Sequence, residues 1–162
     1  MKTAIYPGTF DPITLGHIDV IKKSLNIFDK VIVATTDNIN KNYHFSIDER
    51  LDIINNSLFK DLKFNKKKIK VVSFSNLTID LCKKYNAHAI IRGLRAVSDF
   101  EYEFQLAGMN KKLSSKIETM FLMSDVENQI ISSKFVKEIA SLGGNIDRFV
   151  TRYVVKMLKN KF

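Results

Sequence analysis

The feature of this sequence that most constrains its fold is a regular alternation of short β-rich runs with longer helical patterns. Five apolar runs, rich in β-branched residues, predict strands at 3–6, 30–36, 69–74, 88–92 and 117–123. Parallel strands need crossover connections of this kind, and the connections cover the sheet on both faces. The alternation therefore predicts one domain over residues 1–162: a doubly wound, Rossmann-like α/β fold with a five-stranded parallel sheet and helices on both faces.

The intervening segments carry helix signals. Apolar residues at helical spacing predict a first helix that includes Ile18, Ile21, Leu25 and Phe28. Two Ser-x-x-Glu capping boxes open the next clear patterns. The two boxes predict helices from SIDE (46–49) to about Leu58 and from SDFE (98–101) to about Leu113. A helix between them is expected from Asn76 as N-cap to Lys84. Two more are expected, one over 132–141 that stops at Gly143-Gly144 and one from about Ile146 to the end.

Composition bounds the class of protein. The 162 residues are 45% apolar and 27% charged, which is ordinary globular composition. The single cysteine, Cys82, excludes an internal disulfide framework and a cysteine-based zinc site, and its helical context indicates a small buried hydrophobe. We find no signal-peptide pattern and no apolar run long enough for a membrane helix, so we expect a cytoplasmic protein with no membrane partner.

The net charge of +9 could indicate nucleic acid, a membrane surface or small anions. Nearly all of the excess is lysine spread along the chain. The densest run, NKKKIK at 65–70, lies between a helix pattern and a strand pattern and is interpreted as a solvated loop. We therefore expect no nucleic-acid partner, although a non-catalytic anion or nucleic-acid binding module remains an alternative that +9 suggests.

The stretch YPGTFDPITLGH (6–17) follows the first predicted strand and contains both prolines and two of the six glycines. Gly8 permits close backbone approach to a ligand, and Thr9 adds a hydroxyl. Gly16 and His17 fall in the first turn of the next helix, where unpaired amides attract phosphate. The stretch therefore predicts a phosphate site to which His17 adds a directed donor. The alternative is that the prolines only shape a loop and His17 is a capped or buried histidine.

Three further signals follow other predicted strands. RGLR (92–95) places two arginines at a strand end, and guanidinium groups can hold phosphate oxygens bidentately. ISSK (131–134) offers hydroxyls and amides at a helix start. Lys41 could reach a bound phosphate, and Glu103 could accept from a ribose hydroxyl. Taken singly, these could equally be surface arginines, an ordinary serine cap and solvated charges.

Together, these residues carry a resemblance to a known family. YPGTFDP followed by T-x-G-H at Thr14–His17 resembles the nucleotidylyltransferase superfamily. RGLRAVSDFEYE (92–103) and ISSKFVKE (131–138) make the chain similar to the phosphopantetheine adenylyltransferases, over essentially its whole length. The resemblance implies transfer of the adenylyl group of ATP to 4′-phosphopantetheine, which gives dephospho-coenzyme A and pyrophosphate. It also implies Mg²⁺ as cofactor and a homohexamer.

By matching positions, the resemblance implies specific roles. His17 would stabilise the transition state, and Lys41 and Arg92 would hold the acceptor phosphate, with Thr9 nearby and Thr78 along the pantetheine arm. The residues implied to bind ATP are Thr9, Phe10, His17, Gly93, Leu94, Arg95, Glu103, Asn128, Gln129, Ile130, Ile131, Ser132, Ser133 and Lys134. The chain departs from the family pattern at Asn128, Lys134 and Thr78, and Lys134 could bind phosphate there.

The expected chemistry agrees with these residue types. A phosphate nucleophile is already anionic, so catalysis would rest on positioning and charge stabilisation, without a covalent intermediate. Mg²⁺ would bridge ATP oxygens, with no metal site built from protein residues. The nearest rival is a nucleotidylyltransferase for nicotinamide mononucleotide or a sugar or polyol phosphate. That rival shares the first motif but leaves RGLRAVSDFEYE unexplained.

Overall fold

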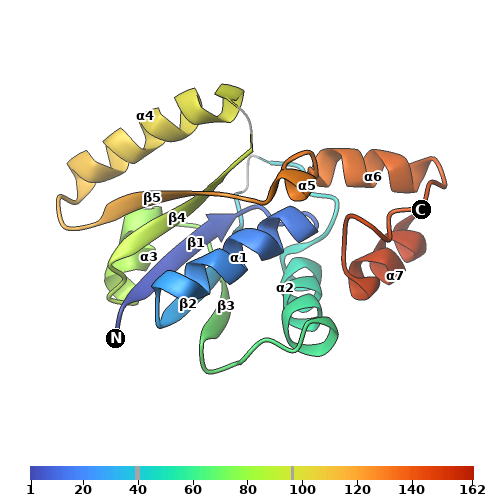
Figure 1. Ribbon diagram of the computed structural model, residues 1–162, viewed down its shortest axis with the longest axis horizontal. Helices are drawn as coiled ribbons and strands as arrows, with labels where there is room; N and C mark the ends of the chain where they lie inside the picture. The colour runs from blue at the N-terminus through green and yellow to red at the C-terminus, as the bar shows by residue number, and fades with distance from the viewer. Residues whose placement is uncertain (39–40, 96) are drawn as a thin grey trace.

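The five predicted strands form one parallel sheet (Figure 1). The structure is a computed structural model that describes residues 1–38, 41–95 and 97–162. The strands are β1 (Thr3–Gly8), β2 (Lys30–Thr36), β3 (Ile69–Phe74), β4 (Ala89–Leu94) and β5 (Glu118–Met123). Their order across the sheet is β3-β2-β1-β4-β5. The predicted α/β class with a five-stranded parallel sheet is confirmed.

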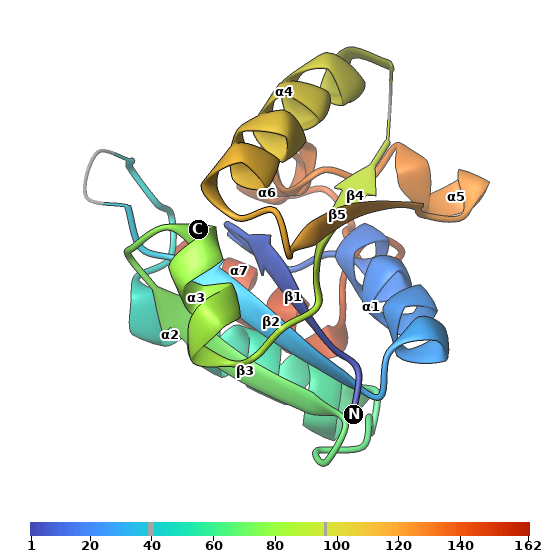
Figure 2. The same cartoon turned by 90° about the vertical axis from the view of Figure 1, so that its left-hand side faces the viewer.

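The helices lie between and after the strands, on both faces of the sheet (Figures 1 and 2). They are α1 (Leu15–Ile27), α2 (Ile47–Asn55), α3 (Thr78–Lys84), α4 (Val97–Leu113), α5 (Val126–Gln129), α6 (Ser133–Ser141) and α7 (Arg152–Lys161). A π-helical segment, η1 (Asn56–Asp61), continues α2. Figure 2 shows α1 and α4 on opposite sides of β5.

The core has two parts because side chains along a strand alternate between the faces of the sheet. On β1, Ala4 and Tyr6 belong to the larger cluster, which includes residues of α1, α2 and α7. Ile5 points to the other cluster, where it lies with residues of α3, including Cys82. Cys82 is completely buried, as its helical pattern predicted, and burial raises the pKa of its thiol to about 11.

The topological switch point lies between β1 and β4, because β1 continues toward β2 and β4 continues toward β5 on the opposite side. The ladder between β1 and β4 contains only two residue pairs and ends at Ile5 and Ile90. Pro7 lies beyond that point, where its missing N–H breaks no bond to β4. Its carbonyl instead accepts from the Arg92 side chain at 3.1 Å. The two strands therefore separate toward their carboxyl ends.

Several predicted boundaries are wrong. β4 runs from Ala89 to Leu94 rather than from 88 to 92, so Gly93 and Leu94 lie inside the strand rather than after it. Helix α3 begins at Thr78 with Leu77 as its N-cap residue, so Asn76 is not the cap. The serine of the SDFE box, Ser98, has a side chain outside the described residues. The segment after β2 includes residues 39 and 40, which also lie outside the described residues.

The last helix, α7, starts later than predicted. The last helix begins at Arg152 rather than near Ile146, because Ile146 and Val150 are already buried in the core as parts of a turn. Tertiary packing of apolar residues overrides their helical spacing here. The short helix α5 was not predicted, since four residues are too few to establish a period.

Two predicted helix signals are confirmed. Ser46 Oγ accepts from the Glu49 amide at 3.2 Å, and Glu49 Oε2 accepts from the Ser46 amide at 2.8 Å. This capping box begins α2 as expected. After α6, Gly143 has a φ of 76°, and the Gly144 amide donates to the Ile139 carbonyl at 2.8 Å. Glycine is favoured at this left-handed position, so the pair ends the helix.

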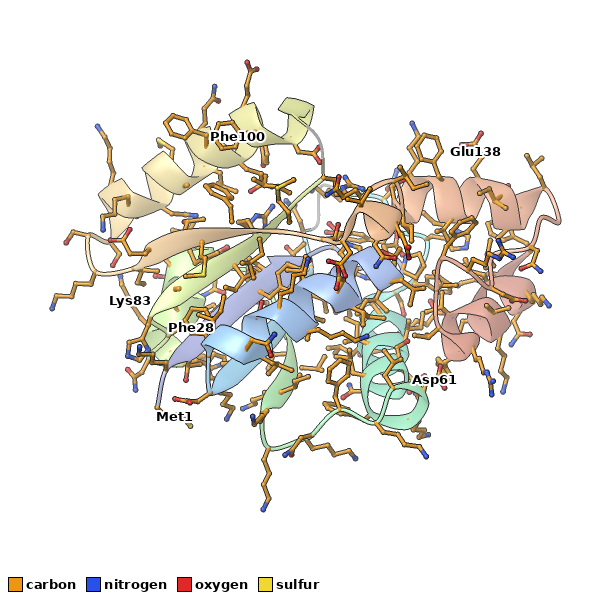
Figure 3. All side chains as sticks on the ribbon, in the orientation of Figure 1. Met1, Phe28, Asp61, Lys83, Phe100 and Glu138 are labelled. Atoms are coloured by element: carbon orange, nitrogen blue, oxygen red, sulfur yellow. The ribbon has the colours of Figure 1, made fainter. Side chains whose placement is uncertain are left out.

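Helix α4 carries several exposed apolar side chains. Its residues Tyr102, Phe104, Met109 and Leu113 are more than half exposed, and Figure 3 shows side chains that project from this helix away from the sheet. We call these four residues the α4 outer surface. Within the described part of the chain, no helix is long and apolar enough to cross a membrane.

Candidate active site

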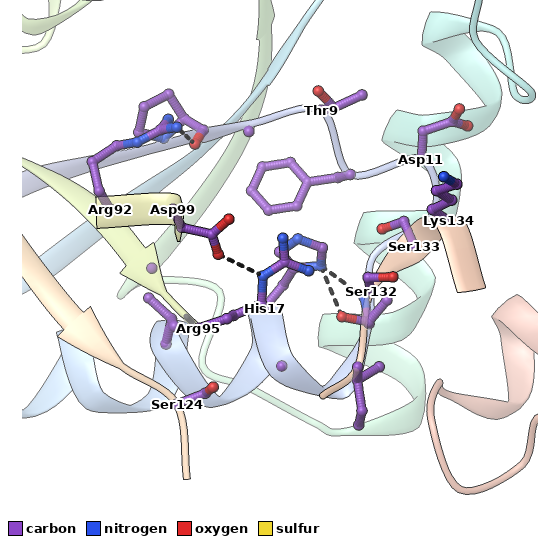
Figure 4. Close-up of a pocket in the computed structure, with 18 of the residues that line it drawn as sticks. Thr9, Asp11, His17, Arg92, Arg95, Asp99, Ser124, Ser132, Ser133 and Lys134 are labelled. Carbon is purple, nitrogen blue, oxygen red and sulfur yellow. Dashed lines mark hydrogen bonds and ion pairs between the residues drawn. The ribbon is translucent and has the colours of Figure 1, made fainter. Parts of the chain in front are cut away.

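A cleft of about 570 Å³ opens at the carboxyl ends of β1 and β4, where the two strands separate (Figure 4). Its walls come from five parts of the chain: the β1–α1 connection, residues 41–43, the end of β4 with the start of α4, Ser124, and residues 131–137. These parts are far apart in sequence. The fold brings them together at the switch point, where ligands bind in open α/β sheets.

Most of the predicted site residues line this cleft. They are Thr9, Phe10, His17, Lys41, Arg92, Gly93, Leu94, Arg95, Glu103, Ile131, Ser132, Ser133 and Lys134. Thr78, Asn128, Gln129 and Ile130 do not line it among the described residues. Thr78 begins α3, and the other three lie in or directly after α5. The Gln129 side chain donates to the Ser124 carbonyl at 3.1 Å, so it supports a wall of the cleft.

The first wall depends on glycine. A Cβ atom at Gly8 would lie 2.8 Å from the ring of Phe10, so a larger residue would displace that ring. Phe10 is buried, and its ring centroid lies 5.1 Å from that of His17 in an edge-to-face arrangement. Gly8 therefore allows Phe10 to pack beneath the loop and against His17. The predicted close approach at Gly8 is to a ring of the protein itself.

The protonation state of His17 follows from its contacts. The Thr14 amide donates to His17 Nδ1 at 3.0 Å, and an amide can only donate. Nδ1 is therefore unprotonated, and the neutral ring carries its proton on Nε2. Burial, with a smaller contribution from the Arg95 cation, lowers the pKa of His17 to about 4. At neutral pH His17 is a hydrogen-bond donor through Nε2 and cannot act as a general base at that atom.

Arg92 is held by Glu103 across the cleft. Its Nε and Nη2 atoms each donate to one oxygen of the Glu103 carboxylate at 2.6 Å. Burial opposes the charged form, but the hydrogen bonds and charge of Glu103 outweigh it and raise the pKa of Arg92. With the bond to Pro7, three of its five N–H groups bind described residues of the protein, and two have no partner among those residues.

Two helices begin at the cleft. Gly16 and His17 belong to the first turn of α1, and Ser133 and Lys134 to the first turn of α6. Ser132 caps α6 by accepting from the Phe135 amide at 3.2 Å. Ser133 Oγ donates to the Pro12 carbonyl at 2.8 Å, which ties α6 to the β1–α1 connection. Both helix N-termini contribute partial positive charge to the same cleft.

The charged side chains of the cleft favour an anion. Its lining contains five cationic and three carboxylate side chains. Each carboxylate is paired with one cation: Glu103 with Arg92, Asp99 with Arg95 at 3.4 Å, and Asp11 with Lys137 at 3.2 Å. Lys41 and Lys134 form no ion pair with the described residues. The two unpaired lysines leave the cleft with an excess of positive charge.

Sequence reasoning missed Asp11 and Lys137. Asp11 is buried and accepts from the amides of His44 and Phe45 at 2.8 and 2.9 Å, in addition to its ion pair with Lys137. Asp11 lies within the first motif, but no local pattern reveals partners 33 and 34 residues away. Lys137 could have been found, because it lies three residues after Lys134 and therefore on the same side of α6.

This arrangement can bind a polyanion and stabilise negative charge that develops during a reaction. Cations, helix N-termini and the His17 Nε2–H group converge on one cleft. Electrostatic stabilisation of this kind needs no proton transfer from the protein. The geometry therefore suits transfer between phosphates better than attack by a protein nucleophile.

Comparison with known proteins agrees with this chemistry. Residues 5–139 match the model of the family described as cytidylyltransferase-like. The phosphopantetheine adenylyltransferase of Pelagibacter ubique (strain HTCC1062) is 66% identical over 161 residues, which cover 99% of this chain and 98% of that protein. The phosphopantetheine adenylyltransferase of Rhizorhabdus wittichii is 48% identical over 156 residues, which cover 96% of this chain and 92% of that protein.

A solved structure shares the fold at low sequence identity. It is from Vibrio parahaemolyticus, from a protein provisionally assigned as a nicotinate-nucleotide adenylyltransferase. The TM-score is 0.74 with 20% identity, and the match covers 99% of this chain and 93% of that one. At this identity the likeness shows the fold alone, and the family and its acceptor depend on the sequence relatives.

Proposed function

Because this chain belongs to the cytidylyltransferase-like family and, within it, to the phosphopantetheine adenylyltransferases, we propose that it transfers the adenylyl group of ATP to 4′-phosphopantetheine. The products are dephospho-coenzyme A and pyrophosphate, and the reaction is the penultimate step of coenzyme A synthesis. The observation that carries the proposal is the cleft itself, where a neutral histidine donor and an excess of cations meet at the switch point.

In the proposed chemical step, an oxygen of the phosphopantetheine phosphate attacks the α-phosphorus of ATP in line. A new P–O bond forms, the bond between the α-phosphorus and the bridging oxygen to the β-phosphate breaks, and pyrophosphate leaves with the electron pair. No protein nucleophile takes part. His17 donates its Nε2–H to the oxygens on which charge develops, and its low pKa keeps it in the neutral form at working pH.

The acceptor phosphate is proposed to bind between Lys41, Arg92 and Thr9. All three line the cleft, and Arg92 has two N–H groups that its protein partners do not use. We expect Thr78 to contact the pantetheine arm farther along, since it lies at the start of α3 outside the cleft lining. Its role rests on the family resemblance.

ATP is proposed to occupy the side of the cleft formed by the end of β4 and the start of α6. Gly93, Leu94 and Arg95 would contact it from β4, and the segment from Ile131 to Lys134 would face its phosphates from α6. Phe10 would pack against the nucleotide. We expect Glu103 to act mainly through Arg92, because both of its oxygens bind that side chain. Asn128, Gln129 and Ile130 would not contact ATP directly. They would support the residues that line this side of the cleft.

We also propose Mg²⁺ as the cofactor, carried on the nucleotide. Within residues 1–38, 41–95 and 97–162, no three or more histidine, cysteine, aspartate or glutamate residues form a group that could hold a metal ion. The three cleft carboxylates each bind a cationic side chain. The residues present therefore fit a Mg²⁺ ion that is ligated by phosphate oxygens of ATP, where it would neutralise part of the triphosphate charge.

A homohexamer in the cytoplasm completes the proposal. The α4 outer surface supports assembly, because large apolar side chains that are exposed on a helix are typical of a protein interface. The number of subunits rests on the family resemblance. The cytoplasmic location rests on the reaction, which consumes ATP.

The test is an acceptor panel with ATP and Mg²⁺. Pyrophosphate release would be measured with 4′-phosphopantetheine, nicotinamide mononucleotide, nicotinate mononucleotide, a sugar phosphate and a polyol phosphate, followed by mass analysis of the products. We expect turnover with phosphopantetheine and a product with the mass of dephospho-coenzyme A. Turnover with another acceptor alone would favour the rival transferase. Salt-sensitive DNA or RNA binding without turnover would favour a binding module.

A further inference from the structure

Residues 43–45, directly after the cleft residues Lys41 and Asn42, are held by two buried charged side chains, Asp11 and Arg50. The Asp11 carboxylate accepts from the amides of His44 and Phe45. Arg50 Nε donates to the Phe45 carbonyl at 3.2 Å, and the Arg50 guanidinium lies 3.9 Å from the centre of the Tyr43 ring. Both ions therefore bind the backbone at Phe45, one at its N–H and the other at its C=O.

The same two ions also hold the β1–α1 connection. Arg50 Nη1 donates to the Thr9 carbonyl at 3.0 Å and to the Thr36 carbonyl at 2.7 Å. The Thr35 hydroxyl, 3.1 Å from Nη1, donates to the Thr9 carbonyl as well. Asp11 itself belongs to this connection. Thr9 and the 43–45 segment are thus joined through Arg50 and Asp11, at the end of β2.

Folding stability alone does not explain the buried Arg50 charge. Arg50 is completely buried, and its Nη2 atom has no hydrogen-bond partner among the described residues, only the Asp37 carboxylate at 3.6 Å. A buried charge of this kind often contributes no net stability compared with an apolar residue. The segments it joins, however, carry Thr9 and Lys41, which reach the cleft from two sides.

Lys41 needs such support. Its side chain is exposed, and a long lysine in a loop has many accessible rotamers. Its approach to a phosphate depends on where the backbone of the following residues lies. Holding residues 43–45 fixes the direction from which Lys41 enters the cleft. The entropy lost in ordering this loop is then lost when the protein folds rather than when the substrate binds.

We propose that Asp11 and Arg50 are positioning residues for the acceptor phosphate, acting through the placement of Thr9 and Lys41 on either side of it. We call the pair the Asp11–Arg50 frame. This inference rests on the proposed function, and it adds two residues whose described contacts are with the protein: Asp11 at the edge of the cleft and Arg50 outside its lining. Asp11 has a further contact with Lys137 on α6, so its loss is expected to affect the nucleotide side as well. Arg50 forms no hydrogen bond or ion pair with α6 among the described residues and acts through Thr9 and the segment after Lys41.

The experiment compares Arg50→Lys and Asp11→Asn in the full-length protein, with Arg152→Lys and Asp48→Asn as controls. The controls make the same chemical changes at exposed positions outside the cleft lining. We expect the frame variants to raise the KM for phosphopantetheine about tenfold, with a smaller change in kcat. For Arg50→Lys, ATP affinity by calorimetry should fall by a smaller factor than the acceptor KM rises, because Thr9 is also implied to contact ATP. A purely structural role would lower kcat through the active fraction and leave the acceptor KM unchanged.

A double-mutant cycle with Lys41→Ala then tests the route. If the frame acts through Lys41, the loss of kcat/KM caused by Arg50→Lys should be clearly smaller in the Lys41→Ala background than in the parent. An equal loss in both backgrounds would overturn the proposal. Thermal unfolding would establish that each variant is folded. If Arg50→Lys does not fold, Asp11→Asn carries the cycle. Absence of turnover in the parent protein would instead count against the proposed function.

Discussion

At the scale of single residues, the chemistry of the site depends on which proton His17 carries. The Thr14 amide assigns Nδ1 as an acceptor, and burial keeps the ring neutral. A neutral imidazole is a weaker acid than an imidazolium ion, but it remains a directed donor and does not carry a charge that must be desolvated. His17 therefore suits a reaction in which the nucleophile is already anionic and only the developing charge needs stabilisation.

Replacement of His17 by alanine should lower kcat by about 10²- to 10³-fold, because one donor to a developing charge is lost. ATP affinity should fall far less, since the contact strengthens mainly in the transition state. Steady-state kinetics would be compared with ATP titrations by calorimetry. A variant that retained nearly all of its kcat would remove His17 from the transition state.

The low pKa of His17 also predicts a pH dependence of stability. The imidazole has its ordinary pKa of 6.5 in the unfolded chain and about 4 in the folded protein. Between these values the unfolded state binds more protons, so the stability due to neutral His17 is full above pH 6.5 and is lost as pH falls toward 4. Urea unfolding at several pH values should show this loss in the parent protein. In His17→Asn this pH-dependent loss of unfolding free energy should disappear. If the unfolding free energies of the two proteins fell in parallel with pH, the assigned pKa of His17 would be wrong.

Arg92→Ala should weaken phosphopantetheine binding by about 10- to 100-fold, the range expected for a lost hydrogen bond to a charged group. ATP binding should change less. Glu103→Gln is the matched control, because it breaks the ion pair and leaves the guanidinium in place. Calorimetry with the acceptor would separate the two variants. Unchanged acceptor affinity in Arg92→Ala would refute the assignment.

At the scale of elements, the site depends on how closely α1 approaches α5. A Cβ atom at Gly16 would lie 3.1 Å from the carbonyl oxygen of Asn128. Gly16 is therefore required for packing as well as for the amide in the first turn of α1. Asn128 and Gln129 do not line the cleft, yet they set the position of its wall at Ser124 and Ile131.

Gly16→Ala should displace α5 by a few tenths of an ångström and weaken ATP binding, with little effect on acceptor binding. Gly108→Ala is the control, because Gly108 lies in α4 and a methyl group there would meet no described atom within 4 Å beyond its chain neighbours and the backbone of the same helix. That change should stabilise the protein by about 0.5–1 kcal/mol, the usual preference for alanine over glycine in a helix. Equal ATP affinity in Gly16→Ala and the parent would show that α5 does not position the nucleotide.

At the scale of the whole molecule, the proposed assembly depends on the α4 outer surface. Tyr102 and Phe104 are 65% and 62% exposed. Helix α4 packs on the sheet mainly through β4 and β5, so its outer side is available for contact with another copy. The surface lies on the opposite side of β5 from α1, so assembly through it would leave the first turn of α1 free to bind ligand (Figure 2).

Phe104→Lys should reduce the assembled mass, because a charge placed in an apolar interface costs more than it gains. Analytical ultracentrifugation of the parent should give the mass of six chains, and the variant should give a smaller species. Lys159→Gln, an exposed change on α7, serves as the control for surface charge. A parent protein that sediments as a monomer would refute the hexamer.

Most of the fold could be predicted from local patterns. Strand and helix periods differ, so the boundaries of β2 and β3 agree with the structure, and the Ser46–Glu49 capping box marks the start of α2. The signals failed where packing overrides spacing. Ile146 and Val150 have helical spacing but are buried in a turn before α7, and the end of β4 extends past Arg92 because its ladder with β5 continues to Leu94.

The sequence by itself determined which chemical groups the protein carries: the glycines, the His17 motif and the arginines all lie in contiguous stretches whose local chemistry favours phosphate. Only the tertiary structure decided how those groups act. It paired Arg92 with Glu103, gave His17 a defined tautomer, and joined Asp11 and Arg50 to the same backbone segment. The reason is physical: propensity and capping act between neighbours in sequence, whereas hydrogen bonds and burial depend on distances that exist only after the chain has folded.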